Sequence, residues 1–191
     1  MPQSGFSMYK NKKNYEEITG KKIIEFLFLV LIGIILGLSL VNLLGITEVY
    51  GASMSPTISS EDRMLINKMS YKKEEPKRGD IIVFNSTLKD DKGNNKSLIK
   101  RVIGLPKERL TIKGGNVYIN GTKIDEPYIN TDYTDGNIDI LIQDGEYFVM
   151  GDNRTVSRDS RDISVGTIDK EDIVGKASIR YFPFSDIGIV K

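Results

Sequence analysis

The sequence predicts a mainly β domain that is preceded by one transmembrane helix. An uncharged apolar run from Phe26 to Ile46 predicts the helix. Short runs of β-forming residues between turn residues predict the β domain, and no long amphipathic helical period interrupts them. A length of 191 residues suits one anchor and one compact domain. We therefore expect a basic tail at 1–22, an anchor at 23–46 and a folded β domain at 47–191.

The apolar run is long enough to span a bilayer, because about 21 residues at about 1.5 Å per residue reach about 32 Å. A buried core helix is one alternative, but a helix that is apolar on all sides needs a larger protein around it. A cleaved secretory signal is another, and its apolar centre usually has only about 7–15 residues. We interpret the run as an uncleaved anchor.

Lysines precede the apolar run. Residues 1–22 contain five lysines and two glutamates, a net charge of +3 within a chain of net charge +1. This bias places the N-terminus in the cytoplasm and everything after Thr47 on the outer side of the membrane. Residues 1–20 contain few hydrophobic residues that would hold them in place, so we expect a poorly ordered tail.

The strands of the β domain are predicted from apolar runs bounded by turn residues, and Asn120-Gly121 is a strong two-residue hairpin signal. Two polar stretches, 86–96 and 130–137, are expected to be exposed loops. The predicted strands are Met64–Met69, Asp80–Asn85, Ser97–Ile103, Arg109–Lys113, Val117–Ile124, Glu146–Met150 and Ala177–Pro183.

Residues that are absent restrict the chemistry. The net charge of +1 argues against nucleic acid as a partner. The chain has no Cys and no His, which excludes disulfides, thiol nucleophiles, thiolate or histidine metal sites and a Ser-His-Asp triad. Proton transfer at neutral pH must therefore use Lys, Asp, Glu or Tyr. We expect neither a metal nor a cofactor.

Ser53 is the candidate nucleophile. Small residues precede it, so another backbone can approach closely, and Pro56 stiffens the turn that follows. The anchor ends only seven residues earlier, so Ser53 lies within about 23 Å of the membrane at about 3.3 Å per residue. We expect a substrate that also lies near the membrane.

Lys100 is the candidate general base for Ser53. The alternation of a strand places it between Leu98 and Val102 on one face and directs Arg101 to the other. Burial there would lower the pKa of its amine from about 10.4. Arg101 cannot serve instead, because a guanidinium does not deprotonate in proteins. The alternative is an ordinary lysine that extends from a half-buried strand into solvent.

Hydroxyls and charges alternate over residues 151–161. A solvated loop explains this stretch, but an extended segment would place Ser157, Asp159 and Arg161 on one face, where they would support a lysine amine. Asp152 and Arg154 are expected to pair with each other in the same way.

At this point the sequence resembles a known family, the bacterial type I signal peptidases. The resemblance covers nearly the whole chain in order, from the basic-flanked anchor onward. It also departs from larger members, which often carry a serine where this chain has Gly51. The motifs that carry it are Ser53-Met54-Ser55-Pro56-Thr57, the stretch from Arg78 to Phe84, Lys100-Arg101-Val102-Ile103-Gly104-Leu105-Pro106, and the stretch from Gly151 to Arg161.

The resemblance implies a fold of coiled antiparallel sheets and a plasma-membrane enzyme that removes signal peptides from exported preproteins. It implies an acyl-enzyme formed on Ser53 with Lys100 as base. We expect the enzyme to act as a monomer. It assigns hydrogen bonding of the lysine to Ser157 and support of the site to Asp159 and Arg161. From the loop residues themselves, we add Asp152 and Arg154 as further candidate supports of the site. The backbone N–H of Ser53 would bind the oxyanion, with the contribution of Gly51 open. Candidate substrate contacts are Val49, Gly51, Met54 and Ile99.

Two other functions fit parts of the sequence. Self-cleaving repressors of the DNA-damage response also use a serine and a lysine, but they lack an anchor and carry a DNA-binding part. An anchored binding protein that retains the fold without activity is the other possibility. Cleavage of a preprotein, compared with a Ser53→Ala variant, would separate that protein from an enzyme.

Overall fold

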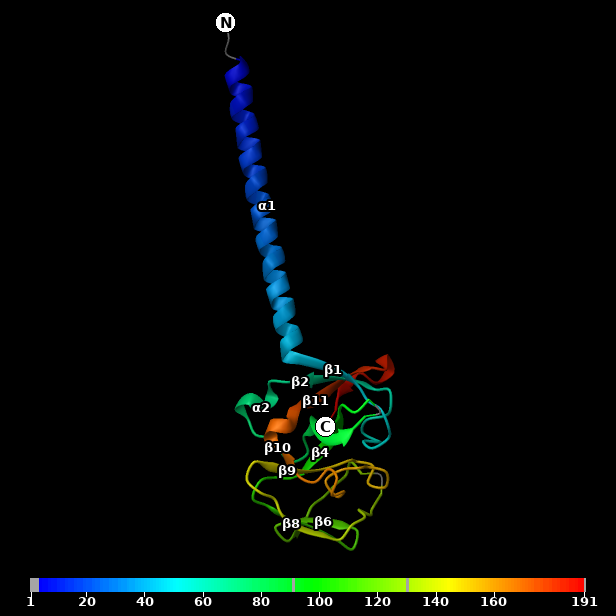
Figure 1. Cartoon of the computed structure of the whole chain (residues 1–191). Helices are drawn as coiled ribbons and strands as arrows, with labels where there is room; N and C mark the ends of the chain where they lie inside the picture. Colours follow the sequence, from blue (N-terminus) through cyan, green and yellow to red (C-terminus); the bar gives the residue numbers. More distant parts are fainter. Residues whose placement is uncertain (1–3, 91, 130, 191) are drawn as a thin grey trace. The chain divides into compact units, whose positions relative to one another are not determined.

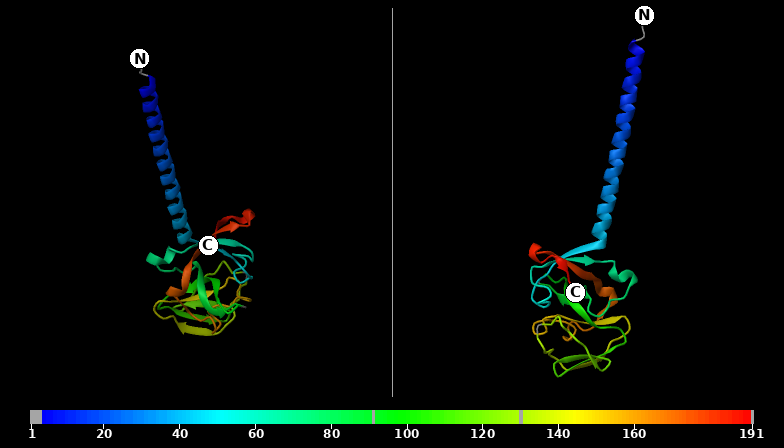
Figure 2. Two further views of the ribbon diagram at one scale, coloured as in Figure 1. Left: turned by 45° about the horizontal axis from the view of Figure 1, so that its top comes forward. Right: turned by 180° about the vertical axis from the view of Figure 1, so that it is seen from behind.

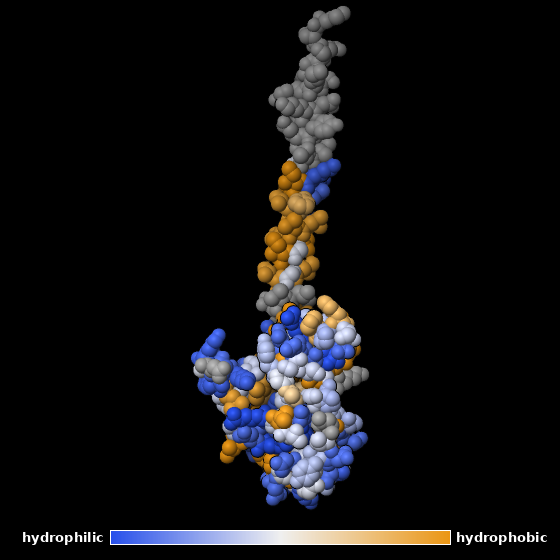
Figure 3. Space-filling view, turned by 90° about the vertical axis from the view of Figure 1, so that its right-hand side faces the viewer, coloured by the Kyte–Doolittle hydropathy of each residue, from blue (hydrophilic) through white to orange (hydrophobic). Residues whose placement is uncertain are grey.

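The computed structural model describes residues 4–90, 92–129 and 131–190, and it divides the chain into two compact units at 1–42 and 43–191 (Figure 1). The first unit is formed by helix α1 (Ser4–Leu43). Its side chains are described at residues 20–38 and 43, and hydrophobic ones cover most of the face in view in Figure 3. Among the described residues, no helix has the length and hydropathy expected of a membrane span.

Two predictions for the N-terminal part are corrected. The helix begins at Ser4, so the backbone from residue 4 to 20 is helical where we expected a poorly ordered tail, and residues 1–3 lie outside the described residues. The helix ends at Leu43, three residues before the expected end of the anchor. Residues 44–46 instead start strand β1, where the backbone pairs with a neighbouring strand.

The second unit contains an eight-stranded antiparallel sheet in the order β1-β2-β11-β3-β4-β9-β10, with β12 paired to β11. Helix α2 (Ser70–Lys73) and two 3-10 turns, η1 (Lys170–Asp172) and η2 (Phe184–Asp186), connect its strands. The strands are β1 (Leu44–Glu48), β2 (Arg63–Asn67), β3 (Ile81–Lys89), β4 (Asn95–Gly104), β9 (Glu146–Met150), β10 (Ile168–Asp169), β11 (Ile173–Phe182) and β12 (Gly188–Ile189).

A smaller antiparallel sheet has the order β7-β6-β5-β8. Figures 1 and 2 show it at one end of the second unit, with β1, β2 and β11 at the other end. Asn120 and Gly121 both have positive φ, 52° and 82°, which confirms the predicted two-residue hairpin turn. Its strands are β5 (Arg109–Lys113), β6 (Asn116–Ile119), β7 (Thr122–Lys123) and β8 (Ile138–Leu141).

Three clusters of buried side chains form the core. One fills the space behind the loop that follows β1, and it includes Val49, Met54 and Ile58. A second lies against the small sheet, and a third packs around Phe84 and Tyr147. Four consecutive residues of β3 are buried because both faces of the large sheet are covered there. This packing fixes the two strands that carry the candidate site.

All seven predicted strand regions contain strands, with shifted ends in most, and the turn at Asn120-Gly121 divides the region Val117–Ile124 into β6 and β7. The predicted loop at 86–96 is shorter, because β3 continues to Lys89 and β4 starts at Asn95. The described residues of the second predicted loop, 131–137, contain no strand, as expected. Strands β1, β8, β10 and β12 were not predicted.

Candidate active site

Ser53 lies in an irregular loop between β1 and β2. Backbone hydrogen bonds hold the start of this loop: the N–H of Val49 donates to the Asp62 carbonyl at 2.9 Å, and the N–H of Glu61 donates to the Val49 carbonyl at 2.8 Å. Met54, on the other side of Ser53, is 1% exposed within the core. The chain is therefore held in place both before and after Ser53, and this fixes the position of the serine.

Lys100 lies on β4 and is 3% exposed. Its Nζ is 2.6 Å from Ser53 Oγ and 3.0 Å from the Ile99 carbonyl oxygen. A neutral amine in this position can donate to the carbonyl while its lone pair accepts the serine proton. The structure thus brings together the two residues that the sequence predicted as a pair.

Burial lowers the pKa of Lys100 to about 8, because an ammonium loses hydration there. The carboxylates of Asp159 and Asp152 act in the opposite direction, while the positive charges of Lys96 and Arg161 lower the pKa further. A substantial share of the amine is neutral near physiological pH, which is the state that a general base requires.

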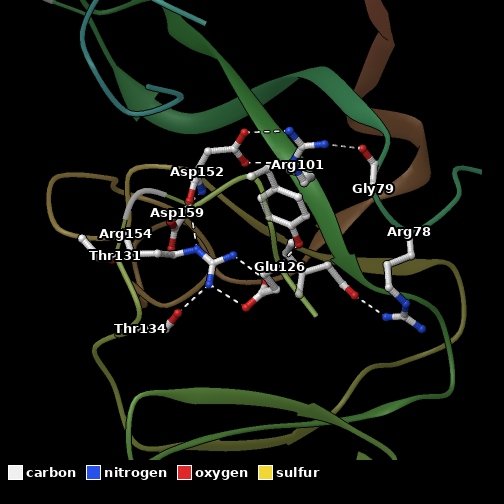
Figure 4. Close-up of polar contacts among 12 residues, drawn as sticks. Arg78, Gly79, Arg101, Glu126, Thr131, Thr134, Asp152, Arg154 and Asp159 are labelled. Atoms are coloured by element: carbon white, nitrogen blue, oxygen red, sulfur yellow. Dashed lines mark hydrogen bonds and ion pairs between the residues drawn. The ribbon is translucent and has the colours of Figure 1, made fainter. Parts of the chain in front are cut away.

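Asp152 connects the serine loop to β4. Its carboxylate accepts two hydrogen bonds from Arg101, at 2.8 and 2.7 Å, and one from the Thr57 hydroxyl at 2.5 Å. Asp152 and Arg101, whose side chains face each other in Figure 4, are almost fully buried. The Arg101 guanidinium lies 4.0 Å from the centre of the Tyr128 ring. Lys100 and Arg101 are adjacent on β4, but their side chains thus contact different residues. Lys100 contacts Ser53, and Arg101 contacts Asp152.

The expected pair of Asp152 and Arg154 is not formed. Arg154 is directed away from Asp152 and donates to Glu126 at 3.0 and 2.5 Å and to Thr134 at 2.5 Å (Figure 4). These ion pairs join loops that lie far apart in the sequence, so local alternation gave no signal for Glu126 or Thr134.

Asp159 and Arg161 support the loop from residue 151 to 161. The fully buried Asp159 carboxylate accepts hydrogen bonds from Arg161 at 2.9 and 3.0 Å and from the Gly151 N–H at 2.9 Å. Arg161 also donates to the Arg154 carbonyl at 2.9 Å. The segment is a folded loop and not the extended one that we expected, but the two residues do hold it.

Gly151 brings this loop against the serine. A Cβ at this position would lie 2.3 Å from the Ser53 carbonyl oxygen and 2.2 Å from Ser157 Oγ. The close approach lets the N–H of Asn153 donate to the Ser53 carbonyl at 3.0 Å. Glycine is therefore needed here for space, and the Gly-Asp-Asn sequence was the available signal.

Ser157 lies beside Gly151, but the expected hydrogen bond to Lys100 is not formed. Its Oγ is buried, and it has no hydrogen-bond partner in the part of the chain that the structure describes. The side chain also lines an open depression that Arg158 and Arg161 border. The prediction for Ser157 assumed the alternation of an extended segment, and this alternation does not set the direction of the hydroxyl in a folded loop.

A cleft of about 580 Å³ opens beside the Ser53–Lys100 pair. Val49, Gly51 and Ile99 line it, as the sequence predicted for substrate contacts. Met54 does not line it, because its side chain packs in the core, and that prediction is corrected. The remaining lining residues come from the end of β1 and the chain after it, from β3 and β4, and from the loop with Arg158.

The cleft follows an open strand edge. Strand β4 pairs with β3 along most of its length, but it pairs with β9 only from Arg101 onward. Residues 95–99 therefore have no strand partner on their second edge within the described chain. On the opposite side of the cleft, Gly51 has φ of +92°, and its N–H donates to Ser60 Oγ at 3.3 Å.

Over the described residues, no group of acidic side chains forms a metal site.

Known proteins match this chain in sequence. The family model described as "Signal peptidase, peptidase S26" matches residues 21–182. "Signal peptidase IB" of Staphylococcus aureus is 38% identical over 154 residues, which are 71% of this chain and 76% of that protein. "Probable signal peptidase I-2" of Synechocystis sp. is 39% identical over 141 residues, 73% of this chain and 63% of that protein.

A solved structure of a signal peptidase I from Enterococcus faecalis has 31% sequence identity and a TM-score of 0.46, and the match covers 55% of this chain and 98% of that one. The family match and the sequence relatives confirm the resemblance that the motifs indicated. This chain belongs to the signal peptidase family, peptidase S26, as a bacterial type I member and a serine endopeptidase.

Proposed function

We propose that this chain is a membrane-anchored endopeptidase that removes signal peptides from exported preproteins with Ser53 as nucleophile and Lys100 as general base. The observation that carries the proposal is the 2.6 Å separation of Lys100 Nζ and Ser53 Oγ, with the amine buried. Burial favours the neutral amine, and hydrogen-bond distance allows direct proton transfer.

The reaction begins when the neutral amine of Lys100 takes the Ser53 proton and Oγ bonds to the scissile carbonyl carbon. The ammonium then gives its proton to the leaving nitrogen, the peptide bond breaks, and an ester to Ser53 remains. The amine next takes a proton from water, whose oxygen attacks the ester. Return of that proton to Ser53 Oγ releases the acid product and restores both groups.

The backbone N–H of Ser53 is the proposed donor to the oxyanion. One such donor typically contributes about 10²–10³ in rate. The N–H at Gly51 already donates to the Ser60 hydroxyl, which supports a lesser role for Gly51 itself.

An extended substrate strand fits the open edge of β4. Backbone groups of residues 95–99 would pair with the segment before the cut, which would lie between β4 and the chain near Val49. Val49 and Ile99 would then contact side chains of that segment. We propose small residues at the first and third positions before the cut, as the family resemblance implies.

The membrane anchor remains part of the proposal. Residues 26–43 carry no charge in the sequence, and the helix continues through them to Leu43. The lysines of residues 1–22 support a cytoplasmic N-terminus, with residues after Thr47 on the outer side of the plasma membrane. We propose a single-pass protein that contacts the bilayer through this helix and acts as a monomer.

Cleavage of a preprotein by the purified full chain in lipid vesicles tests the enzyme. Wild type is expected to release the signal peptide, and Ser53→Ala and Lys100→Arg are expected to be inactive, because arginine keeps the charge but cannot act as a base. Ser55→Ala is the matched control in the same loop. Equal failure of wild type and Ser53→Ala would support the inactive binding protein, and a cytoplasmic C-terminus in a protease-accessibility map would refute the topology.

A further inference from the structure

The far end of the cleft carries positive charge from the hairpin of β3 and β4. Lys89, the last residue of β3, and Lys96, the second residue of β4, both line the cleft. The amine of Lys89 donates to the amide oxygen of Asn95, and neither lysine pairs with a carboxylate among the described residues. Two positive charges therefore face the cleft without a negative partner there.

Other charged residues that line the cleft are already paired. Arg158 lies 2.9 Å from the Asp162 carboxylate, and Glu48 lies 3.4 Å from Arg63. Lys100, at the near end, is the candidate base and needs to be neutral to act. Among the charged side chains that line the cleft, Lys89 and Lys96 are thus the two that have no carboxylate partner in the described part of the chain and are not needed as a base.

The position of Lys96 relates this charge to the substrate. It precedes Lys100 by four residues on one strand, which is about 13 Å at about 3.3 Å per residue. A substrate strand laid along β4 covers the same distance with about four residues. The positive charge of Lys96 also contributes to lowering the pKa of Lys100, after burial as the main cause, so its field extends along the cleft.

We infer that Lys89 and Lys96 form a subsite for a carboxylate side chain that lies about four to six residues before the cut in the substrate. This inference rests on the proposed function, because it assumes that the segment before the cut occupies the cleft. An aspartate or glutamate there gains two favourable charge interactions, and a lysine or arginine meets repulsion. The two lysines are specificity residues that contact the substrate far from the reacting atoms.

The effect should be modest because both lysines are exposed to solvent. Each exposed pair is expected to change cleavage up to about fivefold, so an aspartate should be preferred over a lysine by about three- to tenfold. Salt should weaken the preference, since the Debye length falls from about 10 Å at 0.1 M to about 3 Å at 1 M.

The test uses the full chain in vesicles of zwitterionic lipid and preproteins that differ at one residue. Aspartate, asparagine or lysine is placed four, five or six residues before the cut, and kcat/KM is measured for each. We expect a preference for aspartate in wild type, a ratio near one in the Lys89→Gln/Lys96→Gln double variant, and an inverted ratio in Lys89→Glu/Lys96→Glu. Lys92→Gln, which removes a charge from the same hairpin outside the cleft lining, should keep the wild-type ratio.

The ratio of two substrates on one variant cancels any change in the reactivity of Lys100. A wild-type ratio within twofold of one at all three positions, or a ratio that the double variant leaves unchanged, would overturn the inference. If the substitutions leave these ratios unchanged and lower cleavage only in a parallel assay with vesicles that contain anionic lipid, the lysines serve lipid headgroups and the inference is wrong. If wild type, like Ser53→Ala, cleaves none of the substrates, the proposed function itself fails.

Discussion

The buried amine of Lys100 predicts a pH–rate profile with its midpoint near pH 8. With a pKa of about 8, about one quarter of the amine is neutral at pH 7.5, whereas an ordinary lysine would have about one part in a thousand. Between pH 6.5 and 9 the neutral fraction rises about thirtyfold and then approaches its limit. Because the neutral amine is the base, kcat/KM should rise by the same factor.

The assay is cleavage of a preprotein whose residues near the cut do not titrate in this range, and kcat/KM is used because it reports groups of the free enzyme. Lys100→Arg serves as the control and should remain inactive at every pH. A constant rate from pH 6.5 to 9 would refute Lys100 as the base. A rate that still climbs tenfold per pH unit above pH 9 would refute the effect of burial on its pKa.

Three further predictions concern stability and packing. Lys100→Met should raise the free energy of unfolding by about 1–3 kcal/mol at pH 7, because folding lowers the pKa of Lys100 and the buried ammonium therefore destabilises the folded state. This gain should shrink as the pH rises from about 8 to 10.5, and urea titrations at several pH values measure it. Asp152→Ala should lower the free energy of unfolding by about 3–5 kcal/mol, because it removes the buried carboxylate that accepts two hydrogen bonds from the Arg101 guanidinium. Asp144→Ala, in an exposed pair, should cost under about 1 kcal/mol, and equal losses in thermal melts would contradict this. Gly151→Ala should lower kcat/KM at least about tenfold and the free energy of unfolding by about 1–3 kcal/mol, because its Cβ would overlap the Ser53 carbonyl. Gly188→Ala, which has open space around its Cβ, should change neither kcat/KM nor stability.

The pairing of Ser53 with Lys100 was predictable because the composition left few residue types that could act as a general base. The absence of Cys and His left lysine as the leading base, and strand alternation separated Lys100 from Arg101. The structure places the amine and the hydroxyl at 2.6 Å. Strands with strong apolar runs and a clear turn, such as the hairpin at Asn120, were predictable for the same reason: their signals are local.

Features that depend on distant parts of the chain were not predictable. The apolar run continues through Leu44 to Ile46, so nothing in composition marks the change from helix to strand; pairing with β2 decides it. Met54 is next to the nucleophile, yet its side chain fills the core because the loop curves around it. Arg154 pairs with Glu126, 28 residues earlier in the sequence, and not with the nearby Asp152.

The open edge of β4 has a consequence for the behaviour of the protein in concentrated solution. An unpaired strand edge can accept another chain as readily as a substrate, so it is a site where two copies could aggregate. Lys96 lies on this edge, and Lys89 lies opposite Asn95 in the adjacent strand. Two copies joined through residues 95–99 would bring these lysines close together. Their repulsion therefore opposes self-association, and Lys89→Gln/Lys96→Gln is expected to aggregate at lower concentration than wild type, as light scattering would measure.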